Sequence, residues 1–243
     1  MIFWNPIPVD MLTENDKKTV MGEKMKKAIL FDLDGTLTES GEGIMKSVQY
    51  ALEQMGKPGP AAQRLRVFIG PPLLEQFMKY ANLDREEAKQ AVIYYRERYS
   101  SAGLFENRPY PGIENLLKVL KENGFLLSVA SSKPEKYVVQ ILEYFKIDRY
   151  FDEMTGATMD GKRVEKADVI EEALRRLQMS DDRDHVIMVG DKEHDVIGAR
   201  TAGISCVAVA YGYGTMEELT VSGAEKIVGT VEELQEYLLR GDT

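Results

Sequence analysis

Four short apolar runs, each followed at once by polar or glycine residues, constrain the fold of this chain more than any other feature. The first covers residues 28–31, with lysines before it and an aspartate after it. The others cover residues 125–130, 186–189 and 206–210. Continuous apolar runs of this length are typical of strands buried on both faces of a parallel sheet. Helical patterns separate them, so the sequence predicts an α/β fold built on a doubly wound parallel sheet.

Residues 41–108 show a different pattern, without a buried-strand run. Apolar side chains there recur at helical spacing, as at Ile44 and Val48, so we expect an all-helical insert after the first strand. Its two connections, residues 38–41 and 108–112, contain small, turn-forming residues that suit the hinges of a lid over the sheet edge.

The chain is therefore expected to have three parts. Residues 1–25 form an N-terminal extension, since the first strand pattern begins after them. Residues 26–40 and 109–243 form a Rossmann-like α/β core, and residues 41–108 form a helical cap domain inserted into it.

The charge balance excludes some classes of function. The chain has 31 Lys and Arg against 40 Asp and Glu, a net charge of −9 at pH 7, and no long basic run. It is a poor partner for a phosphate backbone, so no nucleic acid partner is expected. Cys206 is the one cysteine, which excludes an internal disulfide and, with only two histidines, a Cys/His zinc cluster. We expect Cys206 to be a buried core thiol.

No stretch of the sequence approaches the roughly 18 consecutive apolar residues of a membrane helix. The first 25 residues lack the basic start and the small-residue cleavage site of a signal peptide. We therefore expect a cytoplasmic protein without a membrane partner, either a monomer or a homodimer.

Acidic residues stand directly after two of the predicted strands. Asp32 and Asp34 follow the first, Asp191 and Asp195 follow the third, and Ser131 ends the second. The carboxyl ends of parallel strands meet at one edge of a sheet, so these side chains are expected to lie together. Clustered carboxylates repel one another unless a cation is present. A donor set of oxygens alone favours Mg²⁺.

Several other catalytic motifs are missing. The sequence has no Gly-rich loop ending in Lys-Ser or Lys-Thr, no complete dinucleotide fingerprint and no Gly-x-Ser-x-Gly elbow. An aspartate nucleophile beside Mg²⁺ remains, and the reaction that fits it is phosphoryl transfer.

These residues resemble the four ordered motifs of the haloacid dehalogenase-like (HAD) phosphatases. The matching positions are Asp32-Leu33-Asp34-Gly35-Thr36, Ser131, Lys166, and Gly190-Asp191 through Asp195. The resemblance extends from residue 26 to about residue 240, and the helical insert matches the small cap between the first and second motifs. Residues 68–73 and 212–214 make the chain similar to phosphoglycolate phosphatases and the related 5′-nucleotidases within that family.

The resemblance implies a role for each matched residue. Asp32 would attack phosphorus and form an aspartyl-phosphate, while Asp34 would protonate the leaving oxygen and then activate the hydrolytic water. The phosphoryl group would be bound by Ser131, Ser132 and Lys166. The Mg²⁺ ligands would be Asp32, Asp34 through its backbone carbonyl, Asp191 and Asp195.

Some assignments stay open at this point. Lys162 competes with Lys166 for the third motif, and Lys133 contacts substrate or caps the helix after it. The tyrosines at 94, 95 and 99 fit the packing of a cap helix better than a binding site.

The expected activity is that of a Mg²⁺-dependent phosphatase for a small phosphorylated metabolite, phosphoglycolate or a nucleoside 5′-monophosphate. Inorganic pyrophosphate is a further substrate to consider, and a sugar-phosphate mutase is the nearest different reaction. A catalytically silent Mg²⁺-binding interaction module is the alternative of another class. The presence of both Asp32 and Asp34 argues against that module.

Overall fold

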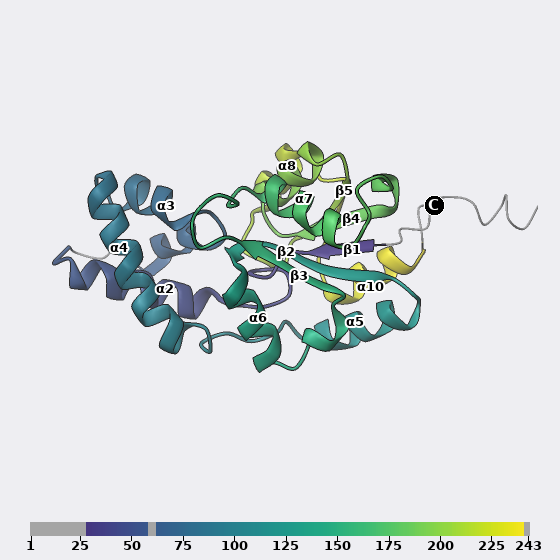
Figure 1. Cartoon of the computed structure of the whole chain (residues 1–243), viewed down its shortest axis with the longest axis horizontal. Helices are drawn as coiled ribbons and strands as arrows, with labels where there is room; N and C mark the ends of the chain where they lie inside the picture. The colour runs from purple at the N-terminus through teal and green to yellow at the C-terminus, as the bar shows by residue number, and fades with distance from the viewer. Residues whose placement is uncertain (1–27, 58–61, 241–243) are drawn as a thin grey trace, which may run out of the picture.

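The computed structural model describes residues 28–57 and 62–240, and their strands form one parallel sheet (Figure 1). The strand order is β3-β2-β1-β4-β5-β6, and every neighbouring pair runs parallel. The strands are β1 (Ala28–Phe31), β2 (Leu126–Pro134), β3 (Glu153–Ala157), β4 (Val186–Gly190), β5 (Ser205–Val209) and β6 (Lys226–Val228). Because the order reverses direction at β1, the sheet is doubly wound, and the predicted α/β class is confirmed.

Helices cover both faces of this sheet. One face carries α5 (Ile113–Glu122), α6 (Glu135–Tyr144) and α10 (Val231–Arg240), and the other carries α7 (Lys166–Arg176), α8 (Glu193–Thr201) and α9 (Met216–Ser222). Side chains of β1 alternate between two apolar clusters. Ile29 and Phe31 pack in the cluster that contains α5 and α6, whereas Ala28 and Leu30 pack in the cluster with α7 and α8. The strand is therefore buried on both faces, as its sequence predicted.

Two strands at the edges of the sheet were not predicted from the sequence. β3 contains glutamate, threonine and glycine, and β6 is only three residues long, so neither has a continuous apolar run. Both form because backbone groups of β2 and β5 are available for pairing.

Between β1 and α5, the part of the chain that the structure describes adds no strand to the sheet, and its longer elements are helices. We call Gly41–Gly103 the helical region. It contains α2 (Gly41–Gln54), η2 (Ala62–Phe68), α3 (Leu73–Tyr80), α4 (Arg85–Arg98) and the π-helical turn η3 (Tyr99–Gly103). It projects from the sheet on the left of Figure 1.

The chain crosses between the sheet and the helical region on two adjacent segments. The backbone N–H of Glu39 donates to the carbonyl of Arg108 at 2.7 Å, and that of Tyr110 donates to the carbonyl of Leu37 at 3.1 Å. These backbone hydrogen bonds fix the two crossings side by side.

Two further expectations concern the rest of the chain. Cys206 is buried in β5, as predicted. Among the residues that the structure describes, no helix has the length and apolarity needed to cross a membrane. The predicted extension, residues 1–25, lies outside the described residues.

Candidate active site

The carboxyl ends of β1, β2 and β4 meet at one small cavity. Asp32 follows β1 directly, and its backbone N–H donates to the carbonyl of Val189 at 2.9 Å. This bond ties the end of β1 to β4 and sets the start of the loop that carries Asp34. The cavity has a volume of about 20 Å³, and its walls include every residue predicted for the site: Asp32, Asp34, Ser131, Ser132, Lys166, Asp191 and Asp195.

Three of the four aspartates form a compact carboxylate cluster. Asp32, Asp191 and Asp195 are all buried, and each offers one oxygen so that these atoms lie within 4.8 Å of one another. Burial and the charges of Asp195 and Asp32 raise the pKa of Asp191 well above its usual range. Burial also raises the pKa of Asp195, against the opposing effect of Lys166. An oxygen-only cluster of this kind fits a hard divalent cation such as Mg²⁺.

Local hydrogen bonds hold Asp191 and Asp195 in place. Asp191 Oδ2 accepts from the backbone N–H of Tyr213 at 2.7 Å. Asp195 Oδ2 accepts from the backbone N–H groups of Asp191 and Lys192 at 3.1 and 3.0 Å, so it caps the start of α8 as well. The loop of the first motif passes close by, because Gly35 has a φ of +92° and a Cβ there would lie 2.2 Å from Asp191 Oδ2.

Lys166, at the start of α7, supplies a cation to this cluster. Its Nζ lies 2.6 Å from Asp32 Oδ1 and 2.8 Å from Asp195 Oδ1, and it donates to the carbonyl of Ala130 at 3.0 Å. Burial lowers its pKa, but the two carboxylates outweigh burial and keep the pKa above its usual value. Lys162, the competing lysine, is exposed and pairs with Asp160. Of these two lysines, the structure therefore brings only Lys166 to the site.

Asp34 lies apart from the carboxylate cluster. Its Oδ2 pairs with Lys133 Nζ at 2.7 Å, and its Oδ1 is buried with no hydrogen-bond partner among the described residues. Lys133 Nζ also donates to the hydroxyl of Tyr99 at 2.6 Å. Burial and the nearby Asp34 raise the pKa of Tyr99 well above its usual range, so this hydroxyl stays neutral. Lys133 therefore bridges Asp34 and the helical region.

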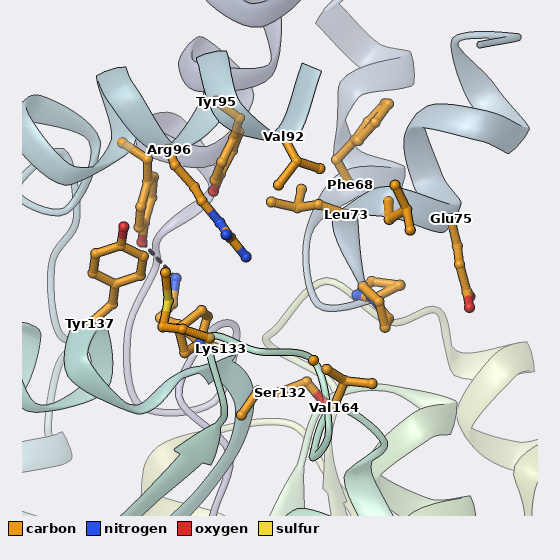
Figure 2. Close-up of a pocket in the computed structure, with 18 of the residues that line it drawn as sticks. Phe68, Leu73, Glu75, Val92, Tyr95, Arg96, Ser132, Lys133, Tyr137 and Val164 are labelled. Carbon is orange, nitrogen blue, oxygen red and sulfur yellow. Dashed lines mark hydrogen bonds between the residues drawn. The ribbon is translucent and has the colours of Figure 1, made fainter. Parts of the chain in front are cut away.

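A larger cavity of about 700 Å³ adjoins the small one. Asp34, Gly70, Ser132 and Lys133 line both cavities, and the larger one extends between the helical region and the sheet. Figure 2 shows Arg96 of α4 reaching from the helical region toward Ser132 and Lys133. Arg96 forms no ion pair with any residue that the structure describes.

Sequence patterns did not identify Arg96 as a cavity residue or the contact between Tyr99 and Lys133. Tyr95 and Tyr99 are buried and stacked on each other at 5.1 Å, as the packing of a helix predicts, but both also line the larger cavity. Tyr95 and Tyr99 therefore pack within the helical region and also form part of the cavity wall. Only the position of η3 against β2 could show this, because helical periodicity gives no information about which segment a helix faces.

The chain forms a six-stranded parallel sheet with buried aspartates at the carboxyl ends of its strands, and a helical segment follows β1. These features together are typical of a hydrolase of the haloacid dehalogenase-like class. Residues 29–209 match the family described as haloacid dehalogenase-like hydrolase. The chain belongs to that family, and the resemblance found in its motifs is confirmed.

Individual relatives narrow the class to phosphatases. A 5′-nucleotidase of Pseudomonas aeruginosa is 45% identical over 191 residues, covering 79% of this chain and 86% of that protein. A crystal structure of a predicted phosphatase from Clostridium acetobutylicum is 46% identical and has a TM-score of 0.85, covering 89% of this chain and 99% of the other. The chain is thus an enzyme of the phosphatase type within the family.

Other relatives are named for other activities. The tyrosine-protein kinase PtkA of Mycobacterium tuberculosis is 38% identical over 212 residues, covering 86% of this chain and 72% of the kinase. Several bacterial phosphoglycolate phosphatases are 25% to 30% identical over 78% to 87% of this chain and 71% to 96% of their own length.

Proposed function

We propose that this protein is a Mg²⁺-dependent phosphomonoesterase that prefers nucleoside 5′-monophosphates. The observation that supports this preference is the cavity of about 700 Å³ that adjoins the small site on the side of Asp34. Cavities of this size commonly hold ligands as large as a nucleoside. Glycolate would leave most of the space unfilled. The 45% identity to a 5′-nucleotidase supports the same choice.

The carboxylate cluster is the proposed metal site. Asp32, Asp191 and Asp195 would hold Mg²⁺, together with the backbone carbonyl of Asp34. When bound, the ion would neutralise charge on the phosphoryl group and on the carboxylates around it. The close approach of three buried carboxylates fits this role, since Lys166 supplies one positive charge against three carboxylates and the remaining negative charge is costly to bury.

The chemical steps follow from the positions of the two aspartates in the first motif. Asp32 would attack phosphorus in line, forming a bond from its carboxylate oxygen as the bond to the leaving oxygen breaks. Asp34 would give its proton to that leaving oxygen, producing the free alcohol and an aspartyl-phosphate. Asp34 would then remove a proton from water as the water attacks phosphorus, releasing phosphate and restoring the Asp32 carboxylate.

The remaining site residues would bind and orient the phosphoryl group. Lys166 supplies a buried cation beside Asp32, and the hydroxyls of Ser131 and Ser132 line the small cavity next to it. Residues 41–108 would act as a cap domain over residues 26–40 and 109–243, excluding water from the intermediate. The paired crossings at Glu39 and Tyr110 would be its hinges.

The test is phosphate release from a panel of substrates, each measured with Mg²⁺ and with a chelator. The panel contains nucleoside 5′-monophosphates, phosphoglycolate, a hexose phosphate and pyrophosphate. We expect chelator-sensitive release that is fastest with a nucleoside 5′-monophosphate. The Asp32→Asn variant should fold with an unchanged circular dichroism spectrum and lose turnover, because an amide replaces the nucleophilic oxygen.

Other outcomes would redirect the assignment. Fastest release from phosphoglycolate or pyrophosphate would overturn the substrate preference but keep the chemistry. Absence of release from folded protein with Mg²⁺ would favour a sugar-phosphate mutase or a silent Mg²⁺-binding module. Substantial activity of Asp32→Asn would refute the mechanism.

The similarity to PtkA gives a second candidate, transfer of phosphate to a tyrosine hydroxyl. It uses the same aspartate chemistry with a different acceptor. Incubation with a labelled nucleoside triphosphate and a tyrosine-containing peptide tests it directly, and stable label on the peptide would favour transfer over hydrolysis.

A further inference from the structure

One buried ammonium group connects the first catalytic motif to the helical region. Lys133, at the end of β2, has its Nζ 2.7 Å from Asp34 Oδ2 and donates to the Tyr99 hydroxyl at 2.6 Å. The same Nζ lies 4.6 Å from the centre of the Tyr99 ring. Lys133 and Asp34 belong to the sheet side of the cavity, whereas Tyr99 belongs to the helical region. Tyr99 is the contact through which the helical region reaches Asp34.

The surroundings of Tyr99 allow little movement. Its ring stacks on Tyr95 at 5.1 Å and meets the ring of Tyr137, from α6, edge-on at 5.7 Å. The π-helical turn that begins at Tyr99 returns the chain so closely that a Cβ on Gly103 would lie 2.7 Å from Tyr99 Cδ2. Single π-helical turns of this kind are frequent at functional sites. The hydroxyl of Tyr99 is therefore a fixed acceptor for the lysine.

Fixing the lysine has a consequence for Asp34. A lysine side chain is a flexible four-carbon stem carrying a compact charge, so one carboxylate contact does not restrain it. The hydroxyl of Tyr99 adds a second contact and holds Nζ at Asp34 Oδ2. The other oxygen, Asp34 Oδ1, is buried without a hydrogen-bond partner among the described residues, and Asp34 lines both cavities. Oδ1 is therefore the Asp34 oxygen that no described protein group engages, and it is the one we assign to the leaving group.

We propose that Tyr99 is a positioning residue that acts through Lys133 to orient Asp34 toward the leaving oxygen of the substrate. This inference rests on the proposed function, in which Asp34 transfers the proton. Because Tyr99 belongs to the helical region, Asp34 is correctly oriented only when that region is docked on the sheet. Docking of the helical region is then linked to proton transfer through the side chains of Tyr99, Lys133 and Asp34.

The leaving group gives a test that a purely structural role would not satisfy. A nucleoside leaves as a poor alkoxide and needs the proton, whereas nitrophenolate leaves readily without one. We expect Tyr99→Phe to lower the ratio of kcat for a nucleoside 5′-monophosphate to kcat for p-nitrophenyl phosphate on the order of tenfold, with KM within about twofold. Tyr94→Phe is the matched control, since Tyr94 is a half-buried tyrosine of α4 that does not line the cavity. It should leave the ratio unchanged.

A second variant tests whether Tyr99 acts through the lysine. Lys133→Met should lower the same ratio, and the double variant Tyr99→Phe/Lys133→Met should lower it no further than Lys133→Met does. Lys133→Arg keeps the positive charge and should recover part of the loss. Melting temperatures measured with Mg²⁺ establish that each variant is folded before the ratios are compared.

The outcomes separate this inference from the proposed function. If the wild-type protein with Mg²⁺ hydrolyses neither substrate, the proposed function fails. If it hydrolyses both but Tyr99→Phe lowers both rates equally, or lowers neither, the positioning role is refuted. Additive effects of the two substitutions would also refute it, because Tyr99 would then act independently of Lys133.

Discussion

Replacing Asp191 by asparagine should stabilise the metal-free protein, although it removes a predicted metal ligand. Two unit charges 4.8 Å apart repel by about 3.5 kcal/mol at an effective dielectric constant of 20. Asp191 has two such neighbours, and the charge of Lys192 with the hydrogen bond from the Tyr213 N–H opposes part of this repulsion, which we count as about one neighbour. An amide has one acceptor oxygen in place of two, which costs about 1 kcal/mol when a hydrogen bond is lost. The net expected gain is about 2.5 kcal/mol.

Thermal unfolding in a chelator at pH 7 measures this gain. For a chain of this size, about 2.5 kcal/mol corresponds to a rise in Tm of about 5–10 °C. Added Mg²⁺ should raise the Tm of the wild-type protein and have little effect on the variant. Asp181→Asn, at an exposed aspartate away from the site, is the control and should leave Tm unchanged.

The pH dependence of the difference in stability between Asp191→Asn and the wild-type protein supplies a second check. The pKa of Asp191 is raised by folding, so the folded protein binds more protons than the unfolded chain between the ordinary value of 3.8 and the raised value. The cost of the ionised carboxylate is fully present above that window and disappears below it. The advantage of Asp191→Asn should therefore be largest at neutral pH and shrink as the pH falls toward 3.8. A lower Tm for the variant in chelator at pH 7 would refute the reasoning.

Three further predictions concern buried groups. Lys166→Met leaves Asp32 and Asp195 without their counter-charge, so we expect a loss of about 3–5 kcal/mol in unfolding free energy by denaturant titration, partly recovered with Mg²⁺. Burial raises the pKa of Cys206, so its thiol should resist a disulfide reagent in native buffer and react stoichiometrically in denaturant; fast native reaction would contradict its burial. Gly43→Ala would place a Cβ 2.0 Å from the carbonyl oxygen of Gly103, and we expect it to destabilise by about 1–3 kcal/mol. An unchanged Tm would contradict that contact.

The main strands and the cluster of acids were predictable because one physical rule connects them. A strand buried on both faces needs a continuous apolar run, and parallel strands bring their carboxyl ends together. Asp32 and Asp191 follow such runs, so their meeting required no knowledge of the tertiary structure. The position of Lys166 at the site was harder to predict, because Lys166 begins a helix and does not follow a buried strand. Its contact with Asp32 depends on how α7 packs on the sheet.

The parts that were missed depend on pairing or packing that the local sequence does not encode. β3 and β6 are strands because β2 and β5 offer free edges, although their own residues are weak strand formers. The sequence Thr230-Val231-Glu232-Glu233 at the start of α10 has the pattern of a capping box, in which residues 230 and 233 would each cap the other's backbone N–H. Thr230 does accept from the N–H of Glu233, but the Glu233 carboxylate accepts from Gly229. The backbone turn before α10 determines which N–H group the Glu233 carboxylate accepts from.

The contact of Lys133 with Tyr99 could not be predicted from the sequence motifs. Tyr99 lies 34 positions away from Lys133 in the chain and on the helical region, and no periodicity relates the two. The contact exists only because η3 docks against the end of β2. If Tyr99 orients Asp34 as proposed, the helical region affects the reaction in two separable ways. Arg96 and its neighbours bound the space for the leaving group, and Tyr99 sets the direction of the acid. Substitutions at Arg96 should then change KM among substrates, whereas substitutions at Tyr99 should change kcat according to the leaving group.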